Sequence, residues 1–311
     1  MLNRRHIRIK VMQSVYALLQ SKSDDLKREE KFLFFSIDKL YNLYVLQLSL
    51  LVEVQKFVKK RLAITNKNRV VSSVENKQAI ENLSQNKFIQ IIANSVSLSE
   101  VIANKKIDNW KEATEYLQVI YDKIKTSAIL KEYDKNKNPS FKEDKQFAIA
   151  IFKEIIAPND KLLDYYEDQY IGWVDDVPFV NTSVLKTYSK LTDKLVLDNL
   201  YKDEDDRAFV KELFEKVVLH HTEYDEEIDK KTPNWDYDRI AEIDLILIKM
   251  AMSEFLYFPS IPTKVTINEY LEIAKDYSSD KSSFFINGVL DKIEKEYQKS
   301  GKISKIGRGL L

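Results

Sequence analysis

Side chains that commonly carry out catalysis or bind metals are scarce in this chain. Its 311 residues include no cysteine and only three histidines, at positions 6, 220 and 221. Adjacent helical residues point about 100° apart, so His220 and His221 predict one packed and one exposed imidazole rather than a metal site. The five glycines are too scattered to form a phosphate-binding loop. We therefore expect no enzyme activity, no catalytic or metal site and no cofactor.

Basic side chains near the N-terminus indicate a different chemistry, the binding of a polyanion. Residues 1–12 contain no acid but four basic residues, although the net charge of the chain is zero. These are Arg4, Arg5, Arg8 and Lys10. The segment 202–244, by contrast, holds far more Asp and Glu than Lys and Arg. Such an uneven distribution suits a chain that meets a polyanion at one surface and another partner elsewhere. An ordinary solvated helix face is the alternative for any single run of charge.

A polar turn followed by two aromatic residues lies near the C-terminus. Lys281 is in the turn, and Phe284 and Phe285 open an expected helix. Because neighbouring helical residues diverge, both rings are not expected to be equally buried. An exposed ring beside a lysine can stack on an unpaired base, as recognition of single-stranded RNA commonly requires. Core packing is the simpler alternative for either ring.

The elements that must position these residues are predicted to be helices. Apolar residues at steps of three and four predict a first helix from about Arg5 to Gln20 and a long buried helix from about Glu29 to Leu62. The composition, with five glycines and six prolines, disfavours a sheet rich in tight turns. An all-α fold is therefore expected. Further helices are expected near 76–94, 97–104, 110–133, 142–156, 178–191, 204–220, 222–231 and 237–257.

Thr266 and Glu269 have the spacing of a capping box. In such a box the threonine hydroxyl and the glutamate carboxylate bind free amides at a helix start. The pattern predicts that a helix begins near Thr266, with a final helix following the polar turn.

The sequence also contains a weak internal similarity at a constant offset of 62 residues. The segment from Glu143 aligns with that from Asp205 without a gap. The aligned pairs include Phe147 with Phe209, Phe152 with Phe214, Trp173 with Trp235, Asp176 with Asp238 and Leu185 with Leu247. Few identities support the pairing, but it predicts a partial internal duplication with two similarly packed helical layers.

Two separated blocks resemble the NusB family. IPTKVTINEYLEIAK at 261–275 and FINGVLDK at 285–292 are similar to the last two helices of that family. DRIAEIDLILIKMAMSEFLYF at 238–258 resembles the helix before them, and NRRHIRIKVMQSVYALLQS at 3–21 resembles its arginine-rich first helix. The blocks occur in the family's order at the two ends of the chain.

This resemblance implies an RNA-binding antitermination factor that supports ribosomal RNA transcription. The implied partners are boxA-like single-stranded RNA, the ribosomal protein NusE and the transcription elongation complex. The residues at family RNA-contact positions are Arg4, Arg5, Arg8, Gln13, Tyr16, Lys264, Lys281 and Phe285. Asp244 is on the helix that faces the protein partner in the family. For Lys264 a role in bracing the turn, and for Asp244 a plain solvent contact, are the alternatives.

The chain also departs from the family pattern. Family members often have an acid where this chain has Lys281, and a lysine should strengthen attraction to phosphate. The expected organisation is a first helix of the NusB-like domain at 1–23, an inserted helical region at 24–200, the rest of the domain at 201–298 and a basic tail at 299–311. The N-terminal helix lacks the features of a signal peptide, and a cytoplasmic location is expected. A helical protein-interaction scaffold without RNA binding is the alternative function. The NusB-like domain of ribosomal RNA methyltransferases is a rival because it shares the fold, but the short stretch after the last expected helix is not expected to hold a methyltransferase domain.

Overall fold

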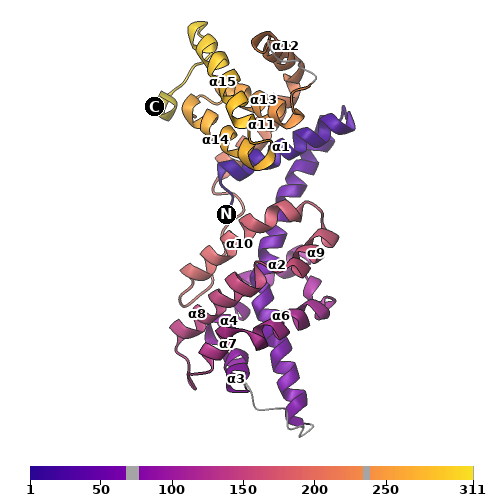
Figure 1. Cartoon of the computed structure of the whole chain (residues 1–311), viewed down its shortest axis with the longest axis vertical. Coiled ribbons are helices and arrows are strands. Elements are labelled where there is room, and N and C mark those ends of the chain that lie inside the picture. The colour runs from indigo at the N-terminus through magenta and orange to yellow at the C-terminus, as the bar shows by residue number, and fades with distance from the viewer. Residues whose placement is uncertain (68–76, 234–238, 311) are drawn as a thin grey trace. The chain divides into compact units, whose positions relative to one another are not determined.

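Helices joined by short loops make up the described part of the protein. The structure is a computed structural model that describes residues 1–67, 77–233 and 239–310, within which no strand occurs (Figure 1). The expected all-α fold is confirmed. In chain order the helices are α1 (Arg4–Ser21), α2 (Leu26–Lys67), α3 (Lys77–Gln85), α4 (Lys87–Ala93), α5 (Val96–Lys105), α6 (Thr114–Thr126), α7 (Ala128–Tyr133), α8 (Phe141–Ile151), α9 (Asp160–Gln169), α10 (Trp173–Lys190), α11 (Glu204–Leu219), α12 (His221–Lys231), α13 (Glu242–Tyr257), α14 (Thr263–Tyr277) and α15 (Ser282–Lys299).

The chain divides into two compact units. Unit 1 comprises Met1–Ile37 and Leu200–Leu311, and unit 2 comprises Asp38–Asn199. Helix α2 contributes residues to both units. None of the described helices is long and apolar enough to cross a membrane.

Helix α13 forms the core of unit 1. Its residues from Asp244 to Phe255 are all buried, and it packs against α1, α11, α14 and α15. A helix that is apolar on every side has to be surrounded by others, which explains its central position. Helix α1 covers α13 with a stripe that is almost fully buried. The stripe consists of Ile7, Val11, Val15 and Leu18.

The core of unit 2 is built around α2. The run from Leu43 to Leu46 is completely buried, and Tyr44 donates to or accepts from Thr187 of α10 at 2.8 Å. Tyr188 of α10 donates to the Leu48 carbonyl at 3.0 Å. The sequence prediction of a long buried helix is confirmed here.

Several helices of unit 2 differ from the predicted boundaries. The single helices expected at 76–94 and 110–133 are each divided, the first into α3 and α4 and the second mainly into α6 and α7. Helix α9 was not expected, although Leu162, Tyr165 and Tyr166 have helical spacing and are buried. Helix α10 begins at Trp173, five residues before Pro178, and so contains the proline in its interior. Proline was expected to precede the helix, because it cannot donate to a carbonyl in the preceding turn.

The predicted capping box at Thr266 is wrong. Helix α14 begins at Thr263, directly after Pro262, so Thr266 and Glu269 already lie inside the helix. The same spacing at Ser140 and Glu143 does form a capping box at the start of α8. Pro262 is the N-cap residue, and its fixed φ suits the extended backbone at that position, so the helix starts three residues before Thr266.

The helix bounds agree with the 62-residue offset. Shifted by 62, α9 overlays α12 to within a residue, and α8 with the π-helical turn η2 (Phe152–Ile156) overlays α11. Phe147, Phe209, Phe152 and Phe214 are all buried. Trp235 and Asp238 lie outside the described residues. A common origin of the two segments stays a prediction.

The end of the chain is bound to the C-terminal end of α13. Lys305 donates to the carbonyls of Glu254 and Phe258 at 3.0 and 2.9 Å, and the Ile306 amide donates to Pro259 at 3.0 Å. Gly309 packs so closely that an added Cβ would lie 2.0 Å from the Pro259 carbonyl oxygen. The tail is therefore part of the fold of unit 1.

Candidate nucleic-acid interface

The first turn of α1 presents two partly exposed arginines. Asn3 caps the helix by accepting a hydrogen bond from the His6 amide at 3.0 Å. A helix N-terminus carries partial positive charge, so basic residues there are disfavoured unless acids lie nearby. Acids from two other helices of unit 1 supply that compensation.

Arg4 and Arg5 are each held by one of these acids. The Arg4 Nε donates to Asp206 of α11 at 3.0 Å, and its guanidinium stacks 4.8 Å from the Phe209 ring centre. Arg5 binds Glu269 of α14 through two hydrogen bonds of 3.0 and 2.9 Å. The hydrogen bonds from Arg5 lower the pKa of Glu269. The arginine side chains remain 38% and 40% exposed, so donors are left for a phosphate.

Arg8 has a different position from the one expected of an RNA contact. Its side chain is 2% exposed and binds the fully buried Glu254 of α13 through hydrogen bonds of 2.7 and 2.9 Å. Burial alone would lower the pKa of Arg8, but the facing Glu254 carboxylate raises it above its ordinary value. Arg8 therefore acts on the geometry of the surface rather than on a phosphate directly.

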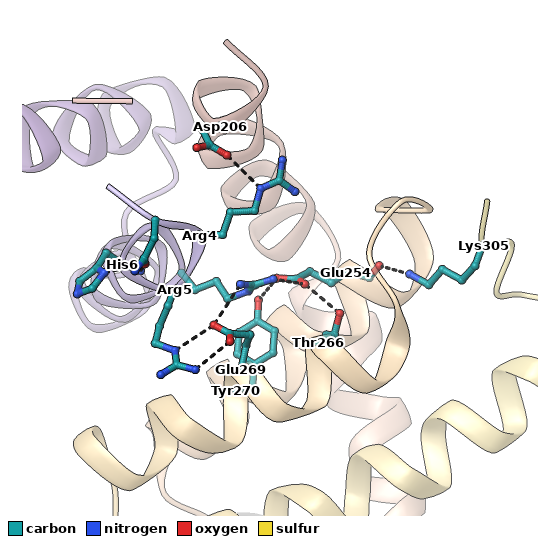
Figure 2. Close-up of polar contacts among 11 residues, drawn as sticks. Arg4, Arg5, His6, Asp206, Glu254, Thr266, Glu269, Tyr270 and Lys305 are labelled. Carbon is teal, nitrogen blue, oxygen red and sulfur yellow. Dashed lines mark hydrogen bonds and ion pairs between the residues drawn. The ribbon is translucent and has the colours of Figure 1, made fainter. Parts of the chain in front are cut away.

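Two further side chains complete the buried network around Glu254. Thr266 and Tyr270 of α14 donate to the carboxylate at 3.0 and 2.6 Å. Figure 2 shows Glu254 between α1 and α14, with Lys305 bound to its backbone carbonyl. A buried ion pair whose carboxylate accepts four hydrogen bonds holds its elements in one arrangement. The T-x-x-E pattern at 266–269 thus serves two arginines instead of a helix start.

These residues border a cavity of about 860 Å³, which we call the arginine groove. Its lining comprises Asn3, Arg4, Arg5, His6, Arg8, Ser260, Ile261, Pro262, Lys264, Val265 and Glu269. Lys264 is exposed. The groove therefore brings together four of the residues proposed from the sequence, from opposite ends of the chain.

His6 is an uncharged member of this groove. Burial, with the nearby charges of Arg5 and Lys10, lowers its pKa to about 4. Its ring contacts the Asn3 side chain at 2.7 Å. At neutral pH His6 adds no charge to the surface.

The remaining predicted contacts lie outside the arginine groove. Lys281 is exposed just before α15, and Phe285 is half-buried. The neighbouring Phe284 is 80% exposed, which makes it the more accessible stacking ring. We call Lys281, Phe284 and Phe285 the turn cluster. The resemblance pointed to Phe285, whereas the divergence of adjacent helical residues was the signal that one ring would be exposed.

Asp244, which the resemblance places on the helix facing a protein partner, is buried inside unit 1 and is not on its surface. It is buried at 4% exposure and accepts a hydrogen bond of 2.6 Å from Ser278, which also contacts Ser282 at 2.8 Å. Asp244 thus anchors the turn that carries Lys281. Any effect on a protein partner would pass through the shape of that turn.

Gln13 and Tyr16 lie on the second half of α1. Tyr16 is 40% exposed and Gln13 is partly exposed. At the end of the same helix Gln20 donates to Glu242, two residues before Asp244. The end of α1 is therefore bound to the start of α13, where Asp244 in turn binds Ser278 in the turn before Lys281.

The side chains of His220 and His221 contact neighbouring aromatic and acidic residues of unit 1. The His220 ring stacks on Tyr257 at 5.3 Å between centres and contacts the Tyr257 hydroxyl and Glu223 at 3.0 Å each. His221 lies 3.7 Å from Asp225. Within residues 1–67, 77–233 and 239–310, no group of three or more metal-binding side chains is assembled.

Comparison with known proteins assigns the chain to a family. The model of the NusB family matches residues 177–295. The transcription antitermination protein NusB of Salinibacter ruber is 42% identical over 117 residues, which are 38% of this chain and 73% of that protein. The chain belongs to the NusB family. This finding confirms the family resemblance drawn from the sequence.

Two other NusB proteins extend the comparison. The transcription antitermination protein NusB of Chloroherpeton thalassium is 38% identical over 122 residues, covering 39% of this chain and 58% of that protein. The one from Natranaerobius thermophilus is 46% identical over 76 residues, covering 24% of this chain and 55% of that protein. No solved structure matched the chain. The NusB match begins at residue 177, within the region expected to be inserted, so the boundary at 200 stays a prediction.

Proposed function

We propose that this NusB family member is an RNA-binding factor of transcription antitermination. In this proposal it recognises boxA-like single-stranded RNA together with NusE, within the transcription elongation complex in the cytoplasm, and supports ribosomal RNA transcription. The arginine groove is the observation that carries the proposal. Two half-exposed arginines and Lys264 surround one cavity, and two carboxylates orient the arginines before RNA arrives.

The groove is suited to the sugar–phosphate backbone rather than to particular bases. Arginine guanidinium groups bind phosphate through paired N–H donors, and preorganisation lowers the entropy lost on binding. Base recognition would come from aromatic rings, since stacking works on unpaired bases. Among the proposed contact regions, Phe284 and Tyr16 have exposed rings that could stack on an unpaired base.

The two ends of α1 give the RNA a path. Arg4 and Tyr16 are twelve residues apart, or about 18 Å along a helix that rises 1.5 Å per residue. A strand that contacts both Arg4 and Tyr16 must therefore span about 18 Å of unit 1. The proposed contacts are Arg4, Arg5, Gln13, Tyr16, Lys264, Lys281 and Phe285, with Arg8 acting through Glu254.

A scaffold that binds only proteins is the second candidate. The observation that favours it is the pairing of Arg4 and Arg5 with carboxylates, which offsets part of the positive potential of the groove. The exposed fraction of both arginines favours RNA binding instead.

Titration of fluorescently labelled boxA-type RNA distinguishes the two candidates. The full chain is titrated with and without NusE, at two salt concentrations, with a scrambled RNA of equal length as the control. RNA binding predicts tighter association with NusE and an affinity that falls steeply with salt. Equal, salt-independent signals for both RNAs would leave the scaffold as the better proposal.

A further inference from the structure

Unit 2 contains a cavity of about 600 Å³ that we call the α5 cavity. It is lined by one face of α2 between Ser49 and Lys56, by the end of α4, by one face of α5 and by the 3₁₀ turn η1 (Asn109–Lys111). The volume is within the range of pockets that hold small organic ligands, which are lined mainly by apolar groups with a few polar ones. All lining residues belong to unit 2, so the cavity is separate from the arginine groove.

Helix α5 leaves apolar surface in contact with water at this cavity. Leu98 is the one residue of its ten that is buried, and Val96 is 68% exposed. Two lining residues of the helix remain accessible, since Ile102 is partly exposed and Ala103 is exposed. A short helix gains its stability from the packing of its apolar face rather than from propensity. An aliphatic ligand in the α5 cavity would therefore bury surface that the fold leaves uncovered.

The lining of the α5 cavity also carries an excess of positive charge. Its charged residues are three lysines and two acids, namely Lys56, Lys106, Lys111, Glu53 and Asp108. Each acid is already paired, Glu53 with Lys56 at 2.8 Å and Asp108 with Lys111 at 3.4 Å. The charge of the exposed Lys106 is therefore in excess. This balance favours an anionic ligand over a cationic one.

The lysine side chains extend into solvent around the cavity. Those of Lys56 and Lys111 are 58% and 77% exposed. Lys59 and Lys60 follow Lys56 on the same face of α2 and are exposed as well. Lysine keeps its stem on apolar surface and its ammonium group in water, so these charges gather at the mouth of the cavity. The arrangement suits a ligand with an apolar chain and an anionic head group.

We propose that the α5 cavity binds a free medium-chain fatty acid. Its alkyl chain would lie against Ile102 and Ala103, and its carboxylate would lie among the lysines at the mouth. The apolar wall selects an aliphatic chain, and the excess of lysine selects the sign of the head group. The proposal does not depend on RNA binding, because it concerns unit 2 alone.

Calorimetric titration of the full chain with decanoate, below its micelle concentration, tests the site. Decyltrimethylammonium is the control of equal chain length and opposite charge. Decanoate should bind saturably at one site, and the cation at least about tenfold more weakly, because it meets the lysines with like charge. Octanoate, which buries fewer methylene groups, should bind about tenfold more weakly than decanoate. Absence of saturable decanoate binding, or equal binding of the cation, would overturn the proposal.

Two matched pairs of variants on α5 locate the binding. Ser99→Glu adds a carboxylate to the lining and should weaken decanoate at least about tenfold, whereas Ser97→Glu, outside the lining, should leave it unchanged. Ala103→Trp should fill the cavity and prevent binding, whereas Asn104→Trp should not. All four replaced residues are exposed, and circular dichroism verifies that each variant folds. Equal decanoate affinities within both pairs would refute the location.

Two further measurements separate the fatty acid from other occupants. Decanoate should slow hydrogen exchange of the α5 amides and leave α11 of unit 1 unchanged, and unchanged exchange in α5 would contradict the proposal. A dimer that Ala103→Trp dissociates in sedimentation equilibrium would assign the cavity to a second copy of the chain. Cosedimentation with phosphatidylglycerol vesicles that the same variant abolishes would assign it to a membrane lipid. Either result would overturn the proposal of a free acid.

Discussion

Buried polar groups are paired in the network of unit 1, whereas several buried oxygens of unit 2 are not. In unit 1 the Glu254 carboxylate receives hydrogen bonds from Arg8, Thr266 and Tyr270. In unit 2 the side-chain oxygens of Gln47, Asn159, Tyr166 and Asn181 have no hydrogen-bond partner among the described residues. A satisfied buried network fixes the elements around it, whereas each unpaired buried oxygen costs stability. The comparison therefore places the polar interior that fixes a surface in unit 1.

The 62-residue offset sharpens this contrast. Tyr166 of α9 aligns with Ile228 of α12, which is completely buried and has no polar atom in its side chain. Pro178 of α10 aligns with Ile240. This tyrosine and this proline of unit 2 therefore have apolar residues at the corresponding positions of unit 1.

Glu254→Ala should produce the largest effect, by breaking the satisfied network. Arg8 would stay buried without its counter-ion, at a cost of about 3–5 kcal/mol in the free energy of unfolding. Urea unfolding followed by circular dichroism measures the loss. Glu132→Ala, at an exposed ion pair in unit 2, should change stability by under about 0.5 kcal/mol. A loss below about 1 kcal/mol for Glu254→Ala would mean that the network does not fix the surface.

Arg4→Ala combined with Arg5→Ala tests the exterior of unit 1. If each arginine binds a phosphate, the slope of log affinity against log salt should become shallower by about 1.4, and affinity should fall about tenfold or more near 0.1 M salt. Arg28→Ala removes an exposed arginine of unit 1 outside the groove and should have little effect. Equal losses in the double variant and in Arg28→Ala would indicate nonspecific attraction only.

Phe284→Ala and Phe285→Ala test which ring of the turn cluster stacks on RNA, the more exposed Phe284 or Phe285, to which the family resemblance points. Loss of a stacked base costs about 1–3 kcal/mol, or about 5- to 150-fold in RNA affinity. Phe284 is 80% exposed, so its removal should spare stability, whereas Phe285→Ala should also lower it. Anisotropy titration and thermal unfolding measure the two effects. Unchanged RNA affinity in both variants would remove stacking from the proposed function.

Tyr166→Phe, without any ligand, tests the unpaired oxygen in unit 2. Removing a hydroxyl that has no partner should leave stability unchanged or raise it by up to about 1 kcal/mol. Tyr188→Phe is the matched control, because the Tyr188 hydroxyl donates to the Leu48 carbonyl at 3.0 Å. That variant should be destabilised. Similar losses of stability in both would show that the Tyr166 hydroxyl is satisfied in solution.

His6 should produce the smallest effect, a dependence of stability on pH. Its pKa is about 4 in the folded chain, against about 6.5 in an unfolded one. The unfolded chain therefore takes up the proton first, and stability falls as the pH decreases from about 6.5 to 4. The expected contribution is under about 1 kcal/mol, since the ring is partly exposed. His6→Gln should reduce this part of the pH dependence, and an identical pH profile would contradict the assignment.

The helices could be predicted from the sequence because their apolar periodicity is strong. The stripe from Ile7 to Leu18 and the buried run from Leu43 to Leu46 show this. The locations of Arg8 and Asp244 could not be predicted, because burial of a charge depends on partners such as Glu254 and Ser278 that are distant in sequence. The unpaired oxygens of unit 2 could not be predicted for the same reason, since Gln47 and Asn181 lose contact with water only when the chain folds.

Gly309 has a consequence for genetic screens. Any larger residue there would collide with the Pro259 carbonyl and displace the tail from the segment that leads into Ser260 and Lys264 of the arginine groove. A substitution at the far end of the chain would then score as a defect in RNA binding, although Gly309 does not line the arginine groove. A deep mutational scan of this protein should recover Gly309 together with the arginines, as a hit without a ligand contact.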